Sequence, residues 1–432
     1  IGAGAAGISL APRLLKRGRR VVLLESGGLD YEAPAADLNA GENEGEAYYQ
    51  LEDSRLRFFG GTTAILGGRC AELDPIDLEA RDYVPHSGWP LGWESCVDLE
   101  ADPRCQIVTH ATVTAIVPGG GGVERVEARS LGAGRLTVRA AAFVLAAGGI
   151  ENPRLLLASR LGNDQVGRYF MEHPHARGGR IVESAAWPLL KAFGRRHRIA
   201  GHDLAALIAP SEALQRRERI LNTSLTIVAR QPQGRRQLIG MKAYSGLKHK
   251  MAPTKRGRAL WMATKKAAGW AQRHIDPARP WLLHKLGGVE LALLVRGEQA
   301  PNPESRVTLA GEKDPTGVPR VKLDWRLSEI DVRSVAVLVE ALGRELGRLG
   351  LGRVEPADWL APAGGRPTRS SPRIRSAAIT ISARPGWAAT RGRASPTRTG
   401  GCTASPICGW RARRSSRPGA GPIRRSPSSP WP

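Results

Sequence analysis

The chain has 432 residues and a formal net charge of +24, a balance that ordinarily suggests nucleic acid or an acidic surface as the partner. The charge is unevenly placed, because no acidic residue follows Asp358 whereas residues 361–432 contain 14 arginines. The remainder holds 50 basic and 40 acidic residues, a net charge of +10, which is ordinary for a basic enzyme. The global charge therefore excludes no enzyme class, and the length allows two domains.

The cysteines and the hydropathy pattern argue against two further kinds of site. The five cysteines show neither a CxxC pair nor the spacing of metal ligands, so we expect no metal site. No apolar run is long enough to span a bilayer, which predicts no integral membrane segment. The chain begins at Ile1, so the lack of a visible signal peptide leaves a cytoplasmic and a periplasmic location both open.

The first 25 residues predict one βαβ unit that lacks most of its first strand. Residues 1–7, IGAGAAG, predict the end of a strand turning into a helix that continues over residues 8–16. Residues 20–25, RVVLLE, then predict a short buried strand. This order of strand end, glycine-rich turn, helix and strand is the context that a dinucleotide-binding motif requires.

Three glycines in this unit form the pattern GxGxxG. Gly2 permits the tight turn, Gly4 lets backbone N–H groups approach a pyrophosphate, and Gly7 allows the helix to pack closely on the strand. The helix N-terminus then faces the anion. Glu25 ends the next strand, where its carboxylate can accept hydrogen bonds from both ribose hydroxyls. The pattern predicts a dinucleotide site.

Two later segments favour FAD over NAD as the dinucleotide. Residues 57–68, RFFGGTTAILGG, combine paired glycines with hydroxyls, so that the main chain can lie against a pyrophosphate and a flavin. Residues 144–149 predict an apolar strand that closes on small residues, a second place where the backbone passes close to the cofactor. A plain NAD domain does not need this second segment.

The rest of the chain alternates between predicted strands and helices up to about residue 360. Residues 106–117 predict a strand, residues 142–149 end a second strand pair, and residues 152–159 predict a short helix with proline near its start. Residues 180–309 contain alternating apolar segments, such as residues 225–228 and 289–295, which are typical of a sheet-based second domain.

A capping box opens a long helix near the end of this region. Ser328 and Asp331 predict a helix through about residue 349. The apolar face of that helix consists of Val335, Leu338, Val339 and Leu342. Beyond Asp358 the periodicity ends, and the composition rich in Arg, Ser, Pro and Gly predicts a disordered tail.

These pieces, in this order, resemble the glucose–methanol–choline (GMC) family of FAD-dependent oxidoreductases. The resemblance rests on IGAGAAG, LLESGG, RFFGGTTAILGG, DPIDLEARDYVPHSGWPLGW, VLAAGGIENPRLLLAS, VGRYFMEHPH and EQAPNPESRVTL. It covers roughly residues 1–360, and the longer sugar- and alcohol-dehydrogenase members are the most similar. The resemblance implies FAD as cofactor and the oxidation of a CH–OH group of a sugar or alcohol by hydride transfer to flavin N5.

The resemblance also implies which residues of this chain hold the cofactor. They fall into an ADP-binding set, a flavin-attachment loop, a backbone contact to adenine and a second flavin-facing turn. These residues are, in that order, Gly2, Gly4, Gly7 and Glu25, then Gly60, Gly61, Thr62 and Thr63, then Val113, then Ala147 and Gly148.

The chain departs from the family at two places. After the SGWPL piece the family carries a long substrate-side segment, whereas here residues 93–97 run almost directly into the next flavin-domain strand, so a segment is expected to be missing. The family also ends with a histidine in an HHxGTTRM-like piece and a His or Asn near NPT, which together remove the proton of the substrate hydroxyl. Neither piece is present, so no catalytic residue is assigned.

A shifted reading frame accounts for the second departure. Residues 377–387, AAITISARPGW, can be back-translated and read from the third base of each codon, and the permitted products include GHHHIGTTRM. Residues 412–432 in the same frame permit SSVFPTGGWANPTLTIVALA. Both products match the family ending in the family spacing. We infer a frameshift between about residues 363 and 375.

Two other features have a plain structural interpretation. His173 and His175 flank Pro174 and are interpreted as a structural pair rather than as catalytic bases. The basic residues 242–285, with Trp261, Trp270 and Trp281, are interpreted as a solvated amphipathic segment, although docking on a membrane or a nucleic acid stays open.

The sequence therefore predicts a mixed α/β two-domain flavoprotein with a Rossmann-like FAD-binding domain beside a sheet-based substrate domain. The expected parts are an FAD-binding domain over residues 1–175, a substrate domain over 176–325, a helical return to the FAD domain over 326–360 and an aberrant tail over 361–432. The expected partner is a small alcohol or sugar and not a nucleic acid, while the electron acceptor is undetermined. The alternatives left open are another two-domain FAD enzyme, such as a monooxygenase, a basic nucleic-acid-binding protein, or an inactive product of the family.

Overall fold

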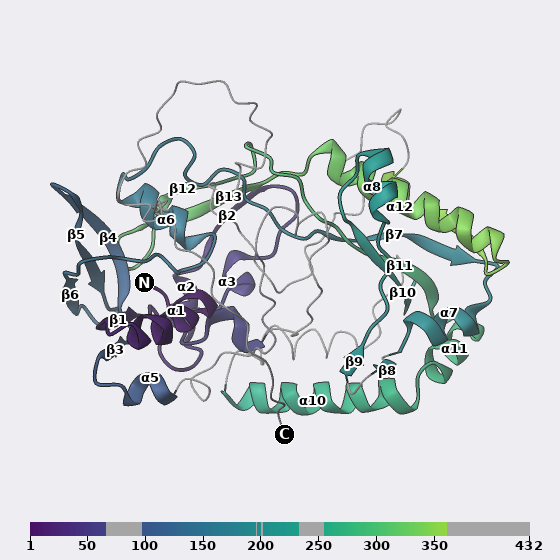
Figure 1. The fold of residues 1–432 in the computed structure, drawn as a ribbon, viewed down its shortest axis with the longest axis horizontal. Helices are drawn as coiled ribbons and strands as arrows, with labels where there is room; N and C mark the ends of the chain where they lie inside the picture. Colours follow the sequence, from purple (N-terminus) through teal and green to yellow (C-terminus); the bar gives the residue numbers. More distant parts are fainter. Residues whose placement is uncertain (66–96, 196, 200–201, 233–254, 361–432) are drawn as a thin grey trace, which may run out of the picture.

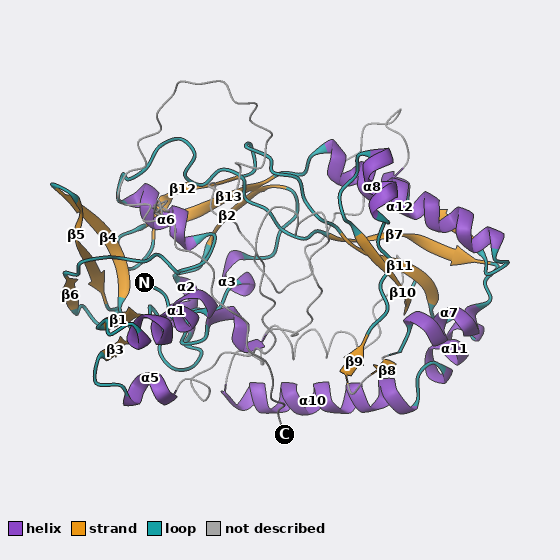
Figure 2. Cartoon of the chain, viewed as in Figure 1, coloured by secondary structure: helices purple, strands orange, loops and turns teal. Residues whose placement is uncertain are grey.

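The computed structural model describes residues 1–65, 97–195, 197–199, 202–232 and 255–360 (Figure 1). The SGWPL piece, the junction expected to lack a segment and the tail after residue 360 lie outside these residues. The described chain forms two lobes, each built from sheets and helices, and the sheet β12–β13–β2 lies in the upper part of the first lobe beside α6 (Figures 1 and 2). The fold is thus the mixed α/β, two-domain arrangement that the sequence predicts, and the domain boundaries stay predictions.

The first lobe begins with the predicted βαβ unit. Helix α1 (Ala5–Lys16) buries Gly7, Ile8, Ala11 and Leu15 on one face. Strand β1 (Val21–Leu24) pairs in parallel with β3 (Cys105–Val108), and Leu23 packs under α1. Helix α5 (Val97–Ala101) leads into β3. Burial of the apolar stripe of α1 on this parallel pair is what fixes the direction of the helix N-terminus.

Residues 106–117 form two strands instead of the single strand that the alternation predicts. Strand β3 ends at Val108 and β4 (Thr112–Gly119) begins after a break in which His110 has a φ of +54°. The break arises because the two strands have different partners: β3 pairs with β1, whereas β4 pairs with β5 (Gly122–Arg129). Strand β6 (Arg135–Val138) completes the β4–β5–β6 meander.

Residues 142–149 do not form the predicted strand. Their backbone contact is with the first residue of the chain: the Ile1 amino group donates to the Val144 carbonyl at 2.8 Å, and Ala146 N–H donates to the Ile1 carbonyl at 2.7 Å. Two hydrogen bonds to a single residue are too few for a ladder. The helix that follows is present as α6 (Glu151–Ala158).

The sheet beside α6 joins distant parts of the sequence. Strand β2 (Gly41–Gly45) pairs in parallel with β13 (Pro319–Trp325), which pairs antiparallel with β12 (Arg306–Lys313). Two short helices, α2 (Ala33–Asp37) and α3 (Leu51–Ser54), flank β2 in the chain. The core on this sheet contains Phe170, Leu323 and the fully buried Trp325.

The second lobe is an antiparallel sheet of order β10–β11–β7–β14. Its strands are β7 (His175–Val182), β10 (Ser224–Arg230), β11 (Glu290–Arg296) and β14 (Arg353–Pro356). Helix α12 (Glu329–Arg348) covers this sheet, and the remaining elements of the lobe are α7 (Ala186–Phe193), α8 (Glu212–Glu218), the hairpin β8–β9 (His197–Ile199 and His202–Leu204) and the 3₁₀ turn Asp358–Leu360.

Helix α12 begins with the predicted capping box, in which the Ser328 backbone N–H donates to Asp331 Oδ2 at 2.7 Å. Its predicted apolar face, Val335, Leu338, Val339 and Leu342, is buried in the core of the second lobe. Residues 326–360 therefore extend the second lobe in the structure, whereas the sequence predicted a return to the first. The apolar face specifies burial, but it carries no information on which of two sheets it covers.

The basic stretch contains two helices. They are α10 (Lys255–His274), which runs along the lower edge of the molecule in Figure 1, and α11 (Ala278–Lys285), which follows it beside α7. No helix among the described residues is long and apolar enough to cross a membrane.

Candidate cofactor site

The three glycines of the GxGxxG turn differ in what surrounds them. Gly2 has a φ of +99°, and a Cβ there would lie 2.6 Å from the Ala146 carbonyl oxygen. A Cβ on Gly7 would lie 2.0 Å from the Gly2 carbonyl oxygen. A Cβ on Gly4 would meet no atom within 4 Å. Gly2 and Gly7 are therefore required by packing, whereas Gly4 leaves open space in front of the helix.

The N-terminus of α1 is exposed to that open space. Gly4 is its N-cap residue, no side chain caps it, and the first turn contains no acidic residue. The first N–H groups of a helix have no intrahelical partner, and the helix dipole adds partial positive charge there. An anion such as a pyrophosphate suits this position.

Glu25 is buried at the end of β1 and is anchored by the backbone. Its Oε2 accepts from Ala3 N–H at 2.8 Å and its Oε1 from Gly27 N–H at 3.0 Å. Each carboxylate oxygen has a further lone pair. The side chain is thus held in one orientation while it retains acceptor capacity, which is what a pair of ribose hydroxyls would need.

The predicted flavin-attachment loop lies against the glycine-rich turn. Gly60 N–H donates to the Ala3 carbonyl at 2.8 Å, and the nearest atom to a Cβ on Gly61 would be Gly4 Cα, at 3.5 Å. Thr62 Oγ1 accepts from Leu56 N–H at 3.1 Å, and the Thr63 hydroxyl donates to the Gly60 carbonyl. These contacts hold two segments together that lie more than fifty residues apart in the sequence.

The second predicted turn is held by Asn152. Its Oδ1 accepts from Ala147 N–H at 2.9 Å, and its backbone N–H donates to the Gly148 carbonyl at 3.0 Å. Gly148 has a φ of +92°, and a Cβ there would meet nothing within 4 Å. Asn152 was not singled out from the sequence. Its position at the start of α6, directly after the small-residue turn, is the signal that could have found it.

A cavity of about 440 Å³ lies where these segments meet, within the range of roughly 300–1,000 Å³ that is usual for small-molecule and cofactor sites. Ten of the eleven residues predicted to bind the cofactor line it, and Gly7 is the exception because it packs behind the turn. Those ten are Gly2, Gly4, Glu25, Gly60, Gly61, Thr62, Thr63, Val113, Ala147 and Gly148. Ser26 and Thr112, whose hydroxyls lie 2.6 Å apart, line the same wall.

A buried ionic network, which the sequence did not indicate, forms another wall of this cavity. Glu151 binds three arginines: Arg55 at 2.5 Å, Arg57 at 3.1 Å and Arg154 at 3.1 Å. Burial alone would raise the pKa of Glu151, but the three guanidinium groups hold that pKa well below its usual range. Glu151 is therefore ionised under all ordinary conditions.

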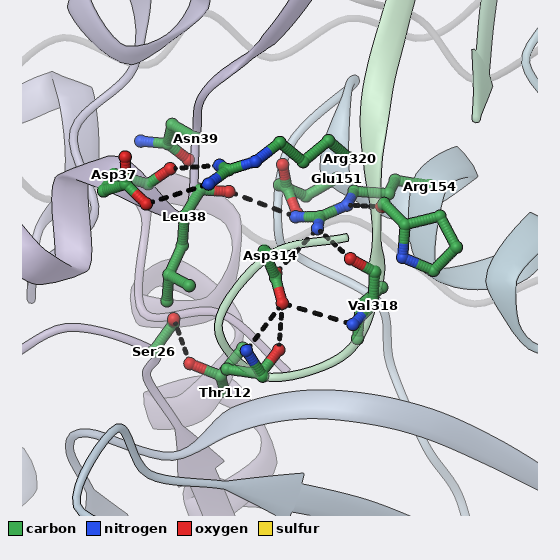
Figure 3. Close-up of polar contacts among 12 residues, drawn as sticks. Ser26, Asp37, Leu38, Asn39, Thr112, Glu151, Arg154, Asp314, Val318 and Arg320 are labelled. Atoms are coloured by element: carbon green, nitrogen blue, oxygen red, sulfur yellow. Dashed lines mark hydrogen bonds and ion pairs between the residues drawn. The ribbon is translucent and has the colours of Figure 1, made fainter. Parts of the chain in front are cut away.

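Arg154 links this network to the turn between β12 and β13 (Figure 3). Arg154 Nη2 lies 2.7 Å from Asp314 Oδ2. The same guanidinium group donates to the Pro319 carbonyl at 2.8 Å and to the Leu38 carbonyl at 3.2 Å. Asp314 Oδ1 in turn accepts from the backbone and the hydroxyl of Thr316. The network thus joins α6, the β12–β13–β2 sheet and the cavity wall. Arg55 and Arg57 lie two residues apart just before the paired glycines, and this spacing is the feature of the sequence that could have indicated the network.

The predicted structural pair of histidines lies at the start of β7. The ring centroids of His173 and His175 are 5.1 Å apart, and burial lowers the pKa of His173. Neither residue lines the cavity. Among the described residues no cluster of His, Cys, Asp and Glu has the arrangement of a metal site.

The donor set of the cavity fits an FAD molecule. Free helix N–H groups face the space in front of Gly4, an anchored carboxylate lies beside it, and two glycine turns leave room for a ring system near the backbone. Gly2, Gly4 and Glu25 would hold the ADP half, and Gly60 to Thr63 with Ala147 and Gly148 would hold the flavin half.

Comparisons with known proteins agree with this cofactor. The model of a family described as GMC oxidoreductase matches residues 98–175, which contain Val113, Ala147, Gly148 and Asn152. The comparison with curated proteins gives no match. Among solved structures, the chain is similar to pyridoxine 4-oxidase from Mesorbium loti, with a TM-score of 0.44 and 14% identity over 85% of this chain and 83% of the other.

A second solved structure, the formate oxidase of Aspergillus oryzae RIB40, has a TM-score of 0.40 and 15% identity, and the match covers 82% of each chain. At these identities and TM-scores neither likeness bears on the substrate of this chain. The family match covers residues 98–175, and the ordered motifs that precede and follow it resemble the same GMC oxidoreductase family, whose members use FAD.

Proposed function

We propose that this chain derives from an FAD-dependent enzyme that oxidises a CH–OH group of a sugar or alcohol, and that it is inactive in its present form. The observation that supports the first part is the cavity, in which ten of the residues expected to bind FAD line one space. The second part rests on the sequence after Asp358, which contains no His, Asp or Glu.

Some groups of this chain would bind the cofactor, and others orient the backbone that lines its site. The N-terminus of α1 would hold an anionic pyrophosphate, and Glu25 would accept from the ribose hydroxyls. Asn152 orients the Ala147–Gly148 turn through its contact with Ala147 N–H. Bound FAD supplies the acceptor for a hydride from the carbinol carbon.

Oxidation of a carbinol also requires a base for the hydroxyl proton. General-base assistance of this step is typically worth roughly 10²–10⁴-fold in rate. In the family this base comes from the C-terminal pieces that are absent here. His173 has the same residue type as the missing base. Its burial and its position outside the cavity disfavour that role.

A binding measurement tests the cofactor assignment. We expect the purified full chain to be yellow or to become yellow on incubation with FAD, with visible absorbance that remains after gel filtration. The Gly120→Ala variant, altered in an exposed hairpin turn, is the control for handling losses. A colourless chain that instead retains NAD would overturn the assignment.

A turnover measurement tests the missing base separately. The chain and a version with its reading frame restored after Ala363 are assayed for reduction of an electron-accepting dye by a panel of sugars and alcohols, at equal FAD content. We expect turnover only from the restored chain. Equal rates from the two chains would show that another group, such as His173, supplies the base.

A further inference from the structure

The helices α10 and α11 expose an unusual number of large apolar side chains. Leu286 has an exposed fraction of 73%, and both Trp270 and Leu282 have 53%. Leu260, Ile275 and Leu283 are also exposed. Trp270 stacks on His274 with ring centroids 4.9 Å apart, so its ring is held at the surface and not buried. Several large exposed apolar side chains in one segment are typical of an interaction surface.

Helix α10 buries few of the side chains that the structure describes. Helices α10 and α12 both have 20 residues, but α12 buries seven side-chain positions, among them five Val and Leu residues. At the positions of α10 whose side chains are described, only Gly257 and Gly269 are buried. Leu260 and Trp270 of α10 therefore do not pack in a core of the described chain.

The charge of the same segment narrows the choice of partner. Residues 255–285 contain eight Lys and Arg and a single acidic residue, Asp276, a net charge of +7. Asp276 is buried beside Arg279 at 3.2 Å, so it does not offset the charge at the surface. Arg256, Lys266 and Lys285 are exposed. The partner must accept aliphatic side chains and carry negative charge.

We propose that α10 and α11 dock this protein on an anionic lipid surface. Leucine, isoleucine and tryptophan side chains lie at the boundary of headgroups and acyl chains, while lysine and arginine bind the acidic headgroups. Single-stranded nucleic acid would instead be bound by a basic groove with stacking aromatics, and four exposed aliphatic leucines add nothing to such binding. The association is peripheral, and it does not depend on the proposed function.

Co-sedimentation with vesicles tests the proposal on the full chain. We expect binding to vesicles of phosphatidylcholine with phosphatidylglycerol, little binding to phosphatidylcholine alone, and weakening as salt is raised. The double variant Leu282→Asp/Leu286→Asp should lower the partition constant by about tenfold or more, because it removes the inserted side chains. The double variant Lys266→Glu/Lys285→Glu should lower it by about tenfold or more through charge.

Matched controls separate this surface from general effects. Leu131→Asp alters an exposed leucine in the first lobe, and Lys16→Glu/Lys313→Glu changes the net charge by the same amount in that lobe. Both controls should retain binding, and circular dichroism should show all variants folded.

Three results would overturn the proposal. The first is a lack of binding to the anionic vesicles. The second is binding that survives both helix variants, because the 14 arginines of residues 361–432 would then be responsible. The third is binding of a single-stranded oligonucleotide that the lysine variant abolishes and the leucine variant leaves unchanged, because that pattern identifies a nucleic-acid surface.

Discussion

The glycines of the cofactor site have different functions at the level of single atoms. Gly2 and Gly7 could not carry a side chain without moving the backbone, since a Cβ on either would overlap a carbonyl group. Gly4 could carry one without touching the protein, because its φ of −84° is open to any residue and the space in front of it is empty. This difference allows binding to be separated from folding.

The Gly4→Val variant should lose FAD but keep its stability. The added methyl groups would occupy the space in front of the α1 N-terminus and block a pyrophosphate. We expect the ratio of visible to protein absorbance to fall to near that of the apoprotein, while the apoprotein thermal midpoint stays unchanged. Gly2→Ala is the contrasting variant and should lower the midpoint, because of its positive φ and the contact with Ala146. Retention of FAD by Gly4→Val would contradict the placement of the pyrophosphate.

The ionic network beside the cavity contributes to stability through one buried pair. Arg154 and Asp314 have exposed side-chain fractions of 4% and 1%. Replacing Arg154 with Met leaves a buried carboxylate uncompensated, and breaking such a pair costs about 3–5 kcal/mol. Urea unfolding measures this loss. Arg344→Met removes an exposed arginine paired with Glu340 and should cost only about 0–1 kcal/mol. Similar losses from both variants would show that burial does not matter here.

At the scale of elements, helix α12 illustrates how far periodicity specifies structure. The capping box at Ser328 and Asp331 sets the start of the helix, and its apolar stripe sets the buried face. Both features are local, so they could be predicted from the sequence. The partner sheet of α12 is not local, so the apolar stripe alone could not specify it. The split between β3 and β4 was missed for the same reason, because the alternation continues across a change of pairing partner.

Leu338→Ala should destabilise the second lobe strongly. Leu338 has an exposed fraction of 3% in the core on the β10–β11–β7–β14 sheet, and truncation of such a leucine costs about 2–5 kcal/mol. Leu349 at the C-terminal end of the same helix is 51% exposed, so Leu349→Ala should change the free energy of unfolding by less than about 0.5 kcal/mol. Both are measured by urea unfolding followed by circular dichroism. A small loss from Leu338→Ala would place α12 outside the core.

The cofactor site shows a similar division between what the sequence can and cannot predict. The residues that supply backbone or a single carboxylate, such as Gly4, Gly61 and Glu25, lie in motifs whose spacing has a physical reason. Arg154 and Asp314 meet across 160 positions of the chain. Neither has a local pattern that would pair them, and only the fold brings them together.

At the scale of the whole molecule, the two lobes meet around a buried hydrogen-bonded cluster. The Glu172 backbone N–H and Trp325 Nε1 both donate to Gln299 Oε1, at 2.9 and 3.0 Å. The Tyr48 hydroxyl donates to Glu172 Oε1 at 3.0 Å. Burial raises the pKa of Glu172 to about 7, although the hydrogen bonds from Tyr48 and the His173 backbone act in the opposite direction. This cluster therefore contains a carboxyl group that keeps its proton up to about pH 7.

This carboxyl group should make stability depend on pH. Folded Glu172 keeps its proton in a range where the unfolded chain has lost it, so the free energy of unfolding falls as pH rises from about 4.5 to about 7. The raised pKa of Glu172 corresponds to a loss of about 3 kcal/mol in the free energy of unfolding across that pH range. Glu172→Gln has no proton to lose and should show a flatter profile by urea unfolding at several pH values. Glu329→Gln, altered at an exposed glutamate, should follow the unaltered chain. A profile unchanged in Glu172→Gln would contradict the assignment.

The parallel pairing of β2 with β13 also has a consequence for synthesis in the cell. Gly41 pairs with Val321, so this sheet stays incomplete until the ribosome has added some 280 further residues. At typical translation rates this interval is on the order of tens of seconds. During it β2 has no partner strand, and Leu323 and Trp325, which later form the core beside it, do not yet exist. The nascent first lobe therefore has an unpaired strand edge for most of its time on the ribosome, where a chaperone would be needed most.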